Sequence, residues 1–215
     1  MKQMPLSPLY PILDFSCFAA KPDPLGAMLR YADELIKHGA SILQYRDKLS
    51  PPMHFLSNAR ELRRLTLNRS TFIINDRADL ALACDADGVH LGQDDLSPAA
   101  ARKIFDQVRD GKKRIIGFST HNLSQIREAE AMHIDYFAVG PVFATGSKVN
   151  PDPVIGLEGV RQAHAVTQKP LVAIGGITRV NAHQVREAGA DSVAVIADLL
   201  DSPAKAVEDF LRVLG

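Results

Sequence analysis

The feature that most constrains this chain is an eightfold alternation of short apolar runs with longer amphipathic stretches. Short apolar runs bounded by turn residues are typical of buried strands, and amphipathic stretches are typical of helices that pack one face on a sheet. We expect strands at 10–13, 41–45, 71–74, 88–91, 115–118, 136–139, 171–174 and 192–196. We expect helices at 24–38, 52–67, 77–83, 98–108, 123–132, 157–166, 180–188 and 204–213.

Eight strand–helix units in 215 residues predict a single-domain (β/α)8 TIM barrel over residues 1–215. A doubly wound open sheet is the alternative. It usually carries a glycine fingerprint after its first strand, and Asp14-Phe15-Ser16 is not one. Ser97-Pro98 and Ser202-Pro203 each place a capping residue before a proline, as helix starts often do.

Composition restricts the partners of the chain. Its 25 basic and 25 acidic residues give a net charge of zero, so no global positive field attracts nucleic acid or an anionic membrane. No apolar stretch approaches the roughly 20 residues of a membrane span, and residues 1–5 begin no signal peptide. Cys17 and Cys84 lack metal-ligand spacing and are interpreted as reduced packing residues. We expect a cytoplasmic protein with small-molecule partners; the oligomeric state stays open, and a homo-oligomer is compatible with the sequence.

Two carboxylates predict a metal site. Asp76 follows the third expected strand and Asp95 follows the fourth, and two parallel strands joined by a helix bring both to the same end of a sheet. Mg²⁺ is usually held by one or two carboxylates together with substrate phosphates. The alternative is that Asp76 caps a helix and Asp95 lies in a solvated loop.

Cationic and amide side chains near the second and third strands favour a metal-bound diphosphate. Gln44, Arg46 and Lys48 alternate along the chain, so they point the same way, and Asn75 directly precedes Asp76. An Arg binds phosphate bidentately and a Lys acts as a point charge. A solvated charged loop is the alternative.

The remaining strand ends predict further ligand contacts. Ser119 follows the fifth strand and offers a hydroxyl to a ligand, whereas we expect Asn122 to cap the next helix. His90 lies within the fourth strand, where a lone histidine is more often a satisfied core residue than a ligand.

A second anion site is predicted after strands six to eight. The loop after the sixth strand carries two hydroxyls and a cation: Thr145, Ser147 and Lys148. Gly175 and Gly176 follow the seventh strand, and Ile196-Ala197 end the eighth. These last two loops often form a phosphate site from backbone N–H groups in such barrels. The sequence has no nucleophile elbow and no zinc-ligand spacing. Two anion sites at one mouth therefore favour a reaction in which a phosphorylated substrate displaces diphosphate.

Several segments resemble the thiamine-phosphate synthase family. Residues 72–93 read FIINDRADLALACDADGVHLGQ and are followed by DDL, a highly specific combination. Further matching segments lie at 44–48, 117–121, 136–148, 173–177 and 188–191. The resemblance runs from about Tyr10 to the C-terminus. It implies a transferase that joins 4-amino-5-hydroxymethyl-2-methylpyrimidine diphosphate to 4-methyl-5-(2-hydroxyethyl)thiazole phosphate, giving thiamine phosphate and pyrophosphate.

The resemblance also implies roles for individual residues. The pyrimidine would contact Gln44 and Ser119, and Mg²⁺ would bind Asp76 and Asp95. The diphosphate would be held by Arg46, Lys48, Asn75 and Lys148. The thiazole phosphate would be held by Thr145, Ser147 and backbone N–H groups at Gly175, Gly176, Ile196 and Ala197. Among these residues, we expect Arg46, Lys48, Ser119 and Lys148 to act in catalysis.

The implied mechanism is dissociative, because the aminopyrimidine delocalises a cation after diphosphate leaves and the thiazole nitrogen then captures it. Three positions depart from the family: Ser147 replaces a frequent Thr, Val149-Asn150 replace a common Lys and Asp, and Ala197 replaces a common Ser. The alternatives are a TenI-like thiazole tautomerase on the same barrel and a non-catalytic thiamine-precursor binding or regulatory protein. The set formed by Gln44, Arg46, Lys48, Asp76 and Asp95 favours the synthase.

Overall fold

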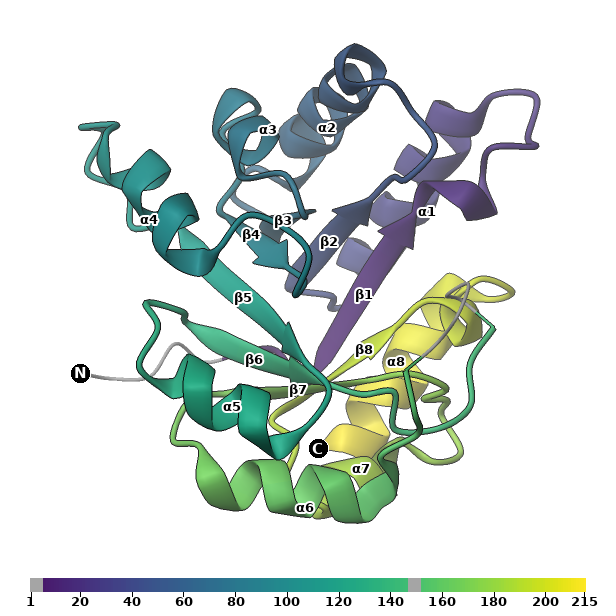
Figure 1. Cartoon of the computed structure of the whole chain (residues 1–215). Coiled ribbons are helices and arrows are strands. Elements are labelled where there is room, and N and C mark those ends of the chain that lie inside the picture. The colour runs from purple at the N-terminus through teal and green to yellow at the C-terminus, as the bar shows by residue number, and fades with distance from the viewer. Residues whose placement is uncertain (1–5, 147–151) are drawn as a thin grey trace.

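The computed structural model describes residues 6–146 and 152–215, which form a closed barrel of parallel strands surrounded by helices (Figure 1). Each strand pairs with its neighbours in chain order, and β1 closes the ring against β8. The strands are β1 (Leu9–Asp14), β2 (Ile42–Arg46), β3 (Thr71–Asn75), β4 (Gly88–Leu91), β5 (Ile115–Thr120), β6 (Tyr136–Val139), β7 (Leu171–Ile174) and β8 (Ser192–Val195). The predicted (β/α)8 TIM barrel is confirmed, and the open sheet is excluded.

The helices of the described residues alternate with these strands. They are α1 (Pro24–Lys37), α2 (Pro52–Thr66), α3 (Ala78–Ala83), α4 (Pro98–Asp106), α5 (Leu123–Glu130), α6 (Gly156–Val166), α7 (Ala182–Glu187) and α8 (Pro203–Leu214). Short 3₁₀ turns follow the first and last strands as η1 (Phe15–Cys17) and η2 (Ala197–Leu199). Ser97 caps α4 by accepting a bond from the Ala100 N–H, as predicted, whereas Ser202 makes no side-chain cap bond to α8.

The element bounds differ from expectation by at most two residues, and the difference that bears on the site lies at the end of β5. Strand β5 runs two residues further than predicted, because Ser119 and Thr120 pair in register with Ala138 and Val139 of β6. Ser119 therefore lies inside a strand rather than in the loop after it. Conversely, Ile196 lies just beyond β8.

The apolar core has two layers, because side chains alternate between the two faces of each strand. The barrel interior is filled by Tyr10, Ile12, Ile42, Ile73, Tyr136, Ala138, Val172 and Ala194. A larger layer lies between the outer strand faces and the helices and includes Leu13, Phe72, Phe137 and Phe210. The register sets Gln44 beside Ile12 and His90 beside Asn75, so polar side chains lie level with the upper interior layer.

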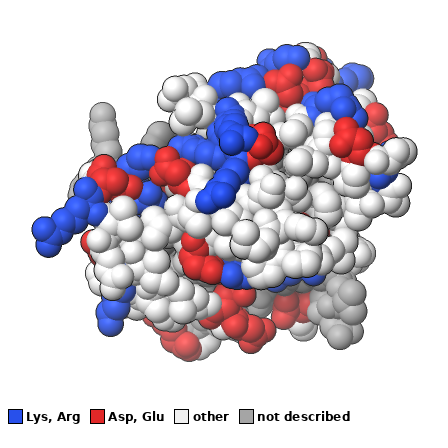
Figure 2. All heavy atoms as spheres, turned by 90° about the horizontal axis from the view of Figure 1, so that it is seen from above, with Lys and Arg blue, Asp and Glu red and all other residues white. Residues whose placement is uncertain are grey.

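The surface over α2 and α3, seen from above in Figure 2, carries interspersed charges of both signs rather than a field of one sign. Ion pairs on this part of the molecule include Arg64 with Glu61 and Arg77 with Asp79. Within residues 6–146 and 152–215, no helix has the length and apolar character to cross a bilayer.

Candidate active site

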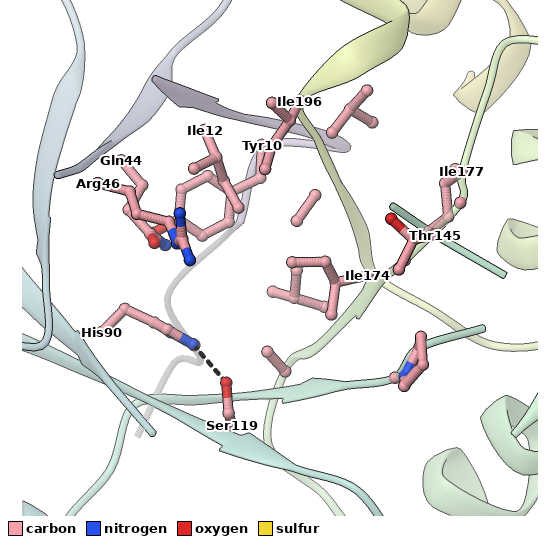
Figure 3. Close-up of a pocket in the computed structure, with 18 of the residues that line it drawn as sticks. Tyr10, Ile12, Gln44, Arg46, His90, Ser119, Thr145, Ile174, Ile177 and Ile196 are labelled. Carbon is pink, nitrogen blue, oxygen red and sulfur yellow. Dashed lines mark hydrogen bonds between the residues drawn. The ribbon is translucent and has the colours of Figure 1, made fainter. Parts of the chain in front are cut away.

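A cavity of about 210 Å³ opens at the carboxyl ends of the strands (Figure 3). Many of the residues predicted from the sequence line it together: Gln44, Arg46, Asn75, Ser119, Thr145, Gly175, Gly176, Ile196 and Ala197. They come from strands and loops spread around the whole ring, so only the closed barrel brings them to one place. Ser147, Lys148, Val149 and Asn150 lie outside the described residues.

Charged side chains next to this cavity form ion pairs between neighbouring strands. The Arg46 guanidinium donates to the Asp14 carboxylate, which is 5% exposed. Asp14 also accepts bonds from the N–H (3.0 Å) and the hydroxyl (2.6 Å) of Ser16, so it starts the η1 turn. Asp14 does not line the cavity itself but pairs with Arg46, which does, and its sequence context predicted no such role. Its position at the end of β1, beside Arg46 in register, is the signal that was available.

Asp76 and Asp95 lie close to each other, next to Asn75, and neither is among the residues that line the cavity. Lys48 donates to the Asp76 carboxylate, and the Asp95 carboxylate accepts the N–H of Gly92 at 2.7 Å. Asp76 has φ +65° and donates its N–H to the carbonyl of His90 at 2.7 Å. The N-cap residue of α3 is Arg77, so Asp76 does not cap that helix. The turn instead presents its side chain toward Lys48 and Asp95.

Burial raises the pKa of Asp76 to about 6, with Lys48 opposing the shift and the nearby Asp95 carboxylate adding to it. Two carboxylates held this close repel each other when both are ionised, and a cation relieves that repulsion. Within the described part of the chain, no group of three or more His, Cys, Asp and Glu side chains is arranged around a metal position. The pair therefore suits an ion that takes its other ligands from phosphate and water, as Mg²⁺ does.

The opposite side of the mouth is built from backbone. Gly175 has φ +102° and Gly176 has φ +62°, values that L side chains rarely adopt. A Cβ on Gly176 would lie 2.8 Å from the Cβ of Phe143, so the turn packs directly on the loop after β6. Among the described residues, the N–H groups of Gly176 and Ile196 donate no hydrogen bond. These groups are available to an anion at the cavity wall.

Two side-chain contacts brace this backbone side. Asp198 accepts the backbone N–H of Arg179 at 2.7 Å and its Nε at 3.0 Å, which ties the loop after β7 to η2. His121 lines the cavity, and its Nδ1 lies 2.8 Å from the carbonyl of Gly140. Asn122 caps α5 as predicted, accepting the N–H of Gln125 at 3.0 Å.

Polar groups that the sequence analysis did not select lie in the barrel interior below the cavity. His90 is buried with both ring nitrogens bonded, so it is the satisfied residue that was expected, but it also lines the cavity. Tyr10 and Tyr136 are buried, and their hydroxyls are 2.9 Å apart. Tyrosine inside an apolar run is a weak signal, because most such residues serve only as packing.

Comparison with known proteins agrees with this arrangement. A family model described as thiamine monophosphate synthase matches residues 17–199. A curated thiamine-phosphate synthase of Koribacter versatilis (strain Ellin345) is 50% identical over 206 residues, 96% of this chain and 95% of that one. A solved structure of thiamine phosphate pyrophosphorylase from Pyrococcus furiosus has a TM-score of 0.81 at 33% identity, covering 96% of this chain and 95% of that chain. A structure of 3-hexulose-6-phosphate synthase, at 15% identity and a TM-score of 0.68, shares the fold alone.

Proposed function

The chain belongs to the thiamine monophosphate synthase family. We propose that its reaction takes place at the barrel mouth between two sides. The cation–carboxylate side is formed by Arg46, Lys48, Asp76 and Asp95, and the backbone side by Gly175, Gly176 and Ile196. The chain is a thiamine-phosphate synthase, a transferase that releases pyrophosphate. The proposed substrates are 4-amino-5-hydroxymethyl-2-methylpyrimidine diphosphate and 4-methyl-5-(2-hydroxyethyl)thiazole phosphate. The observation that carries this placement is that paired charged side chains lie on one side of the mouth, whereas on the other side the N–H groups of Gly176 and Ile196 donate no hydrogen bond within the part of the chain that the structure describes.

The diphosphate is assigned to the cation–carboxylate side. Arg46 and Lys48 would exchange their carboxylate partners for phosphate oxygens, and Asn75 would add an amide donor. Asp76 and Asp95 would hold Mg²⁺. When bound, the ion would neutralise charge on the diphosphate. Arg46 and Lys48 stabilise the charge that grows as the bond from carbon to diphosphate oxygen breaks.

The thiazole phosphate is assigned to the backbone side. Thr145 and the N–H groups near Gly175, Gly176, Ile196 and Ala197 would bind it, while Ser147 and Lys148, implied by the resemblance, lie outside the described residues. Fixing the phosphate at one wall aims the thiazole nitrogen at the pyrimidine carbon. Because the aminopyrimidine delocalises positive charge, bond cleavage can precede attack, and the protein contributes orientation and exclusion of water.

Ser119 and Gln44 are assigned to the pyrimidine between these two anions. Both line the cavity and both carry groups suited to a heterocyclic edge. We further propose that residues 1–215 act as one domain in the cytoplasm, where the free thiols Cys17 and Cys84 stay reduced. Burial raises the pKa of Cys84 to about 11, which keeps its thiol unreactive.

One incubation tests the proposal. Purified protein is mixed with both substrates and Mg²⁺, with an EDTA control, and thiamine phosphate and pyrophosphate are followed together. We expect both products in equal amounts and only with the metal. A folded protein that binds the thiazole phosphate but forms neither product would refute the proposal and favour the tautomerase or the binding protein.

A further inference from the structure

A continuous chain of hydrogen bonds crosses the barrel interior and ends at two groups assigned to the pyrimidine. Gln44 donates from Nε2 to the Tyr10 hydroxyl at 3.2 Å, and this hydroxyl lies 2.9 Å from the hydroxyl of Tyr136. The Tyr136 hydroxyl lies 3.0 Å from Nδ1 of His90, and Nε2 of His90 lies 2.8 Å from the Ser119 hydroxyl. Figure 3 shows the last of these bonds at the cavity wall. These five side chains are called the relay below.

The relay is held rigidly by packing. The rings of His90 and Tyr136 stack at 5.6 Å with an interplanar angle of 20°, and Tyr10 meets Tyr136 edge-on at 6.0 Å. Gly117 provides the space for this contact, because a Cβ there would lie 2.6 Å from Nδ1 of His90 and closer still to the Tyr136 ring. This packing fixes the positions of the two tyrosine rings and of the imidazole ring.

Counting protons gives the relay a direction. Burial raises the pKa values of Tyr10 and Tyr136, so both hydroxyls keep their single proton. The proposed relay has His90 as the neutral imidazole, which donates from one nitrogen and accepts at the other. A proton donated by Gln44 at one end therefore requires each following group to donate in turn. At the other end, His90 donates to Ser119, which leaves the proton of the Ser119 hydroxyl for a ligand.

We propose that the relay is a specificity device in which Gln44 presents an acceptor to the bound heterocycle and Ser119 presents a donor, with the two coupled through Tyr10, Tyr136 and His90. With Nε2 of Gln44 engaged by Tyr10, Oε1 is the polar atom left for the ligand; among the described residues it accepts no hydrogen bond. The three inner residues are positioning residues, because they act through the two that touch the substrate.

The ligand edge selected in this way has an exocyclic amino group, which donates, and a ring nitrogen, which accepts. A 4-aminopyrimidine has that pattern. The corresponding pyrimidin-4-one has a carbonyl in place of the amino group and a ring N–H, so it presents the opposite pattern. To bind it, all five groups of the relay must reverse together. This inference rests on the proposed placement of the pyrimidine at Gln44 and Ser119.

The test compares two substrates, the aminopyrimidine diphosphate and its 4-oxo analogue, by the ratio of their kcat/KM values. Tyr136→Phe removes the middle hydroxyl, which frees each end to reorient separately. We expect the preference for the amino substrate to fall about tenfold, the worth of one or two neutral hydrogen bonds. Tyr31→Phe is the matched control, because Tyr31 is a buried tyrosine of α1 outside the relay.

A second variant separates coupling from simple damage. Tyr10→Phe breaks the same relay one bond earlier, so the double variant with Tyr136→Phe should lose no more preference than either single variant. An unchanged ratio in both folded single variants, or additive losses in the double variant, would overturn the relay. Wild-type turnover of the amino substrate tests the proposed function separately; if it forms no thiamine phosphate, that function and the relay fall together.

Discussion

The two sides of the barrel mouth offer different groups to an anion: charged side chains on one side and backbone N–H groups on the other. On the side of β1 to β4, charged side chains are already paired, with Arg46 on Asp14 and Lys48 on Asp76. On the side of β6 to β8, the N–H groups of Gly176 and Ile196 have no acceptor among the described residues. The first side exchanges one anionic partner for another, whereas the second offers donors that are already oriented.

This difference predicts different sensitivities. Side-chain charges depend on protonation, on neighbouring charges and on salt. Backbone donors depend instead on local conformation, which the left-handed turn at Gly175 and Gly176 sets. The cation–carboxylate side should therefore fail when a charge is removed, and the backbone side should fail when shape is altered.

The largest expected effect comes from removing one carboxylate. Asp76→Asn should lower turnover about 10³-fold, because it removes a proposed metal ligand and the partner of Lys48. Steady-state rates at saturating Mg²⁺ measure the effect. Asp79→Asn is the control, since Asp79 pairs with Arg77 on the exposed face of α3 and should keep full activity. Near-normal Mg²⁺-dependent turnover in Asp76→Asn would remove Asp76 from the metal site.

The second largest effect should come from shape on the backbone side. Gly176→Ala forces a side chain into φ +62° and against Phe143, so the KM for the thiazole phosphate should rise about 100-fold, with far less change for the diphosphate substrate. Gly111→Ala is the matched control, because φ there is +73° and an added Cβ meets nothing within 4 Å. Equal losses for both substrates would show that the two sides are not independent.

The third prediction concerns stability. Asp76→Asn should lower turnover, but the same substitution should stabilise the metal-free protein. Burial raises the pKa of metal-free Asp76 to about 6, above the ordinary value of about 3.9. The stability that this group contributes is present below about pH 4 and is lost as the pH rises through 6. At pH 7.5 without metal, Asp76→Asn should therefore raise the free energy of unfolding by about 1–2 kcal/mol.

Thermal unfolding in EDTA measures this stability effect, with a rise in Tm of about 2–6 °C expected for a chain of this size. The gain should shrink toward pH 4, where the wild-type carboxyl is protonated. Asp79→Asn provides the opposite case, because the hydrogen bond from Arg77 lowers the pKa of Asp79. A less stable Asp76→Asn protein at pH 7.5 would mean that Lys48 outweighs burial at this site.

Features set by local sequence could be predicted, whereas contacts between residues far apart in the chain could not. The alternation of strands and helices was readable because each element carries its own periodicity. Gln44 and Arg46 were readable because both lie on one strand, two residues apart. The partner of Arg46 lies 32 residues away, and Tyr10 and Tyr136 are 126 residues apart. Such pairs depend on strand register and ring closure, which no local pattern encodes.

Strand ends were the other source of error. Ser119 was expected in a loop and lies within β5, because pairing with β6 extends the strand by two residues. Asp76 was open to interpretation as a helix cap, and the positive φ of its turn directs it elsewhere. Local sequence therefore located the residues of the mouth, while their partners required the closed barrel.

The smallest expected effect tests whether the backbone side binds the thiazole phosphate without help from side-chain donors. The resemblance to the family predicts a Ser at the position where this chain has Ala197. If N–H groups bind the thiazole phosphate, Ala197→Ser should change its KM less than about threefold, because a hydroxyl added beside satisfied phosphate oxygens contributes little net energy. Steady-state KM measurements on the wild type and the variant at fixed Mg²⁺ decide this. A tenfold or larger drop in KM would show that a side-chain donor was missing, and that this side of the mouth depends on side chains as its opposite does.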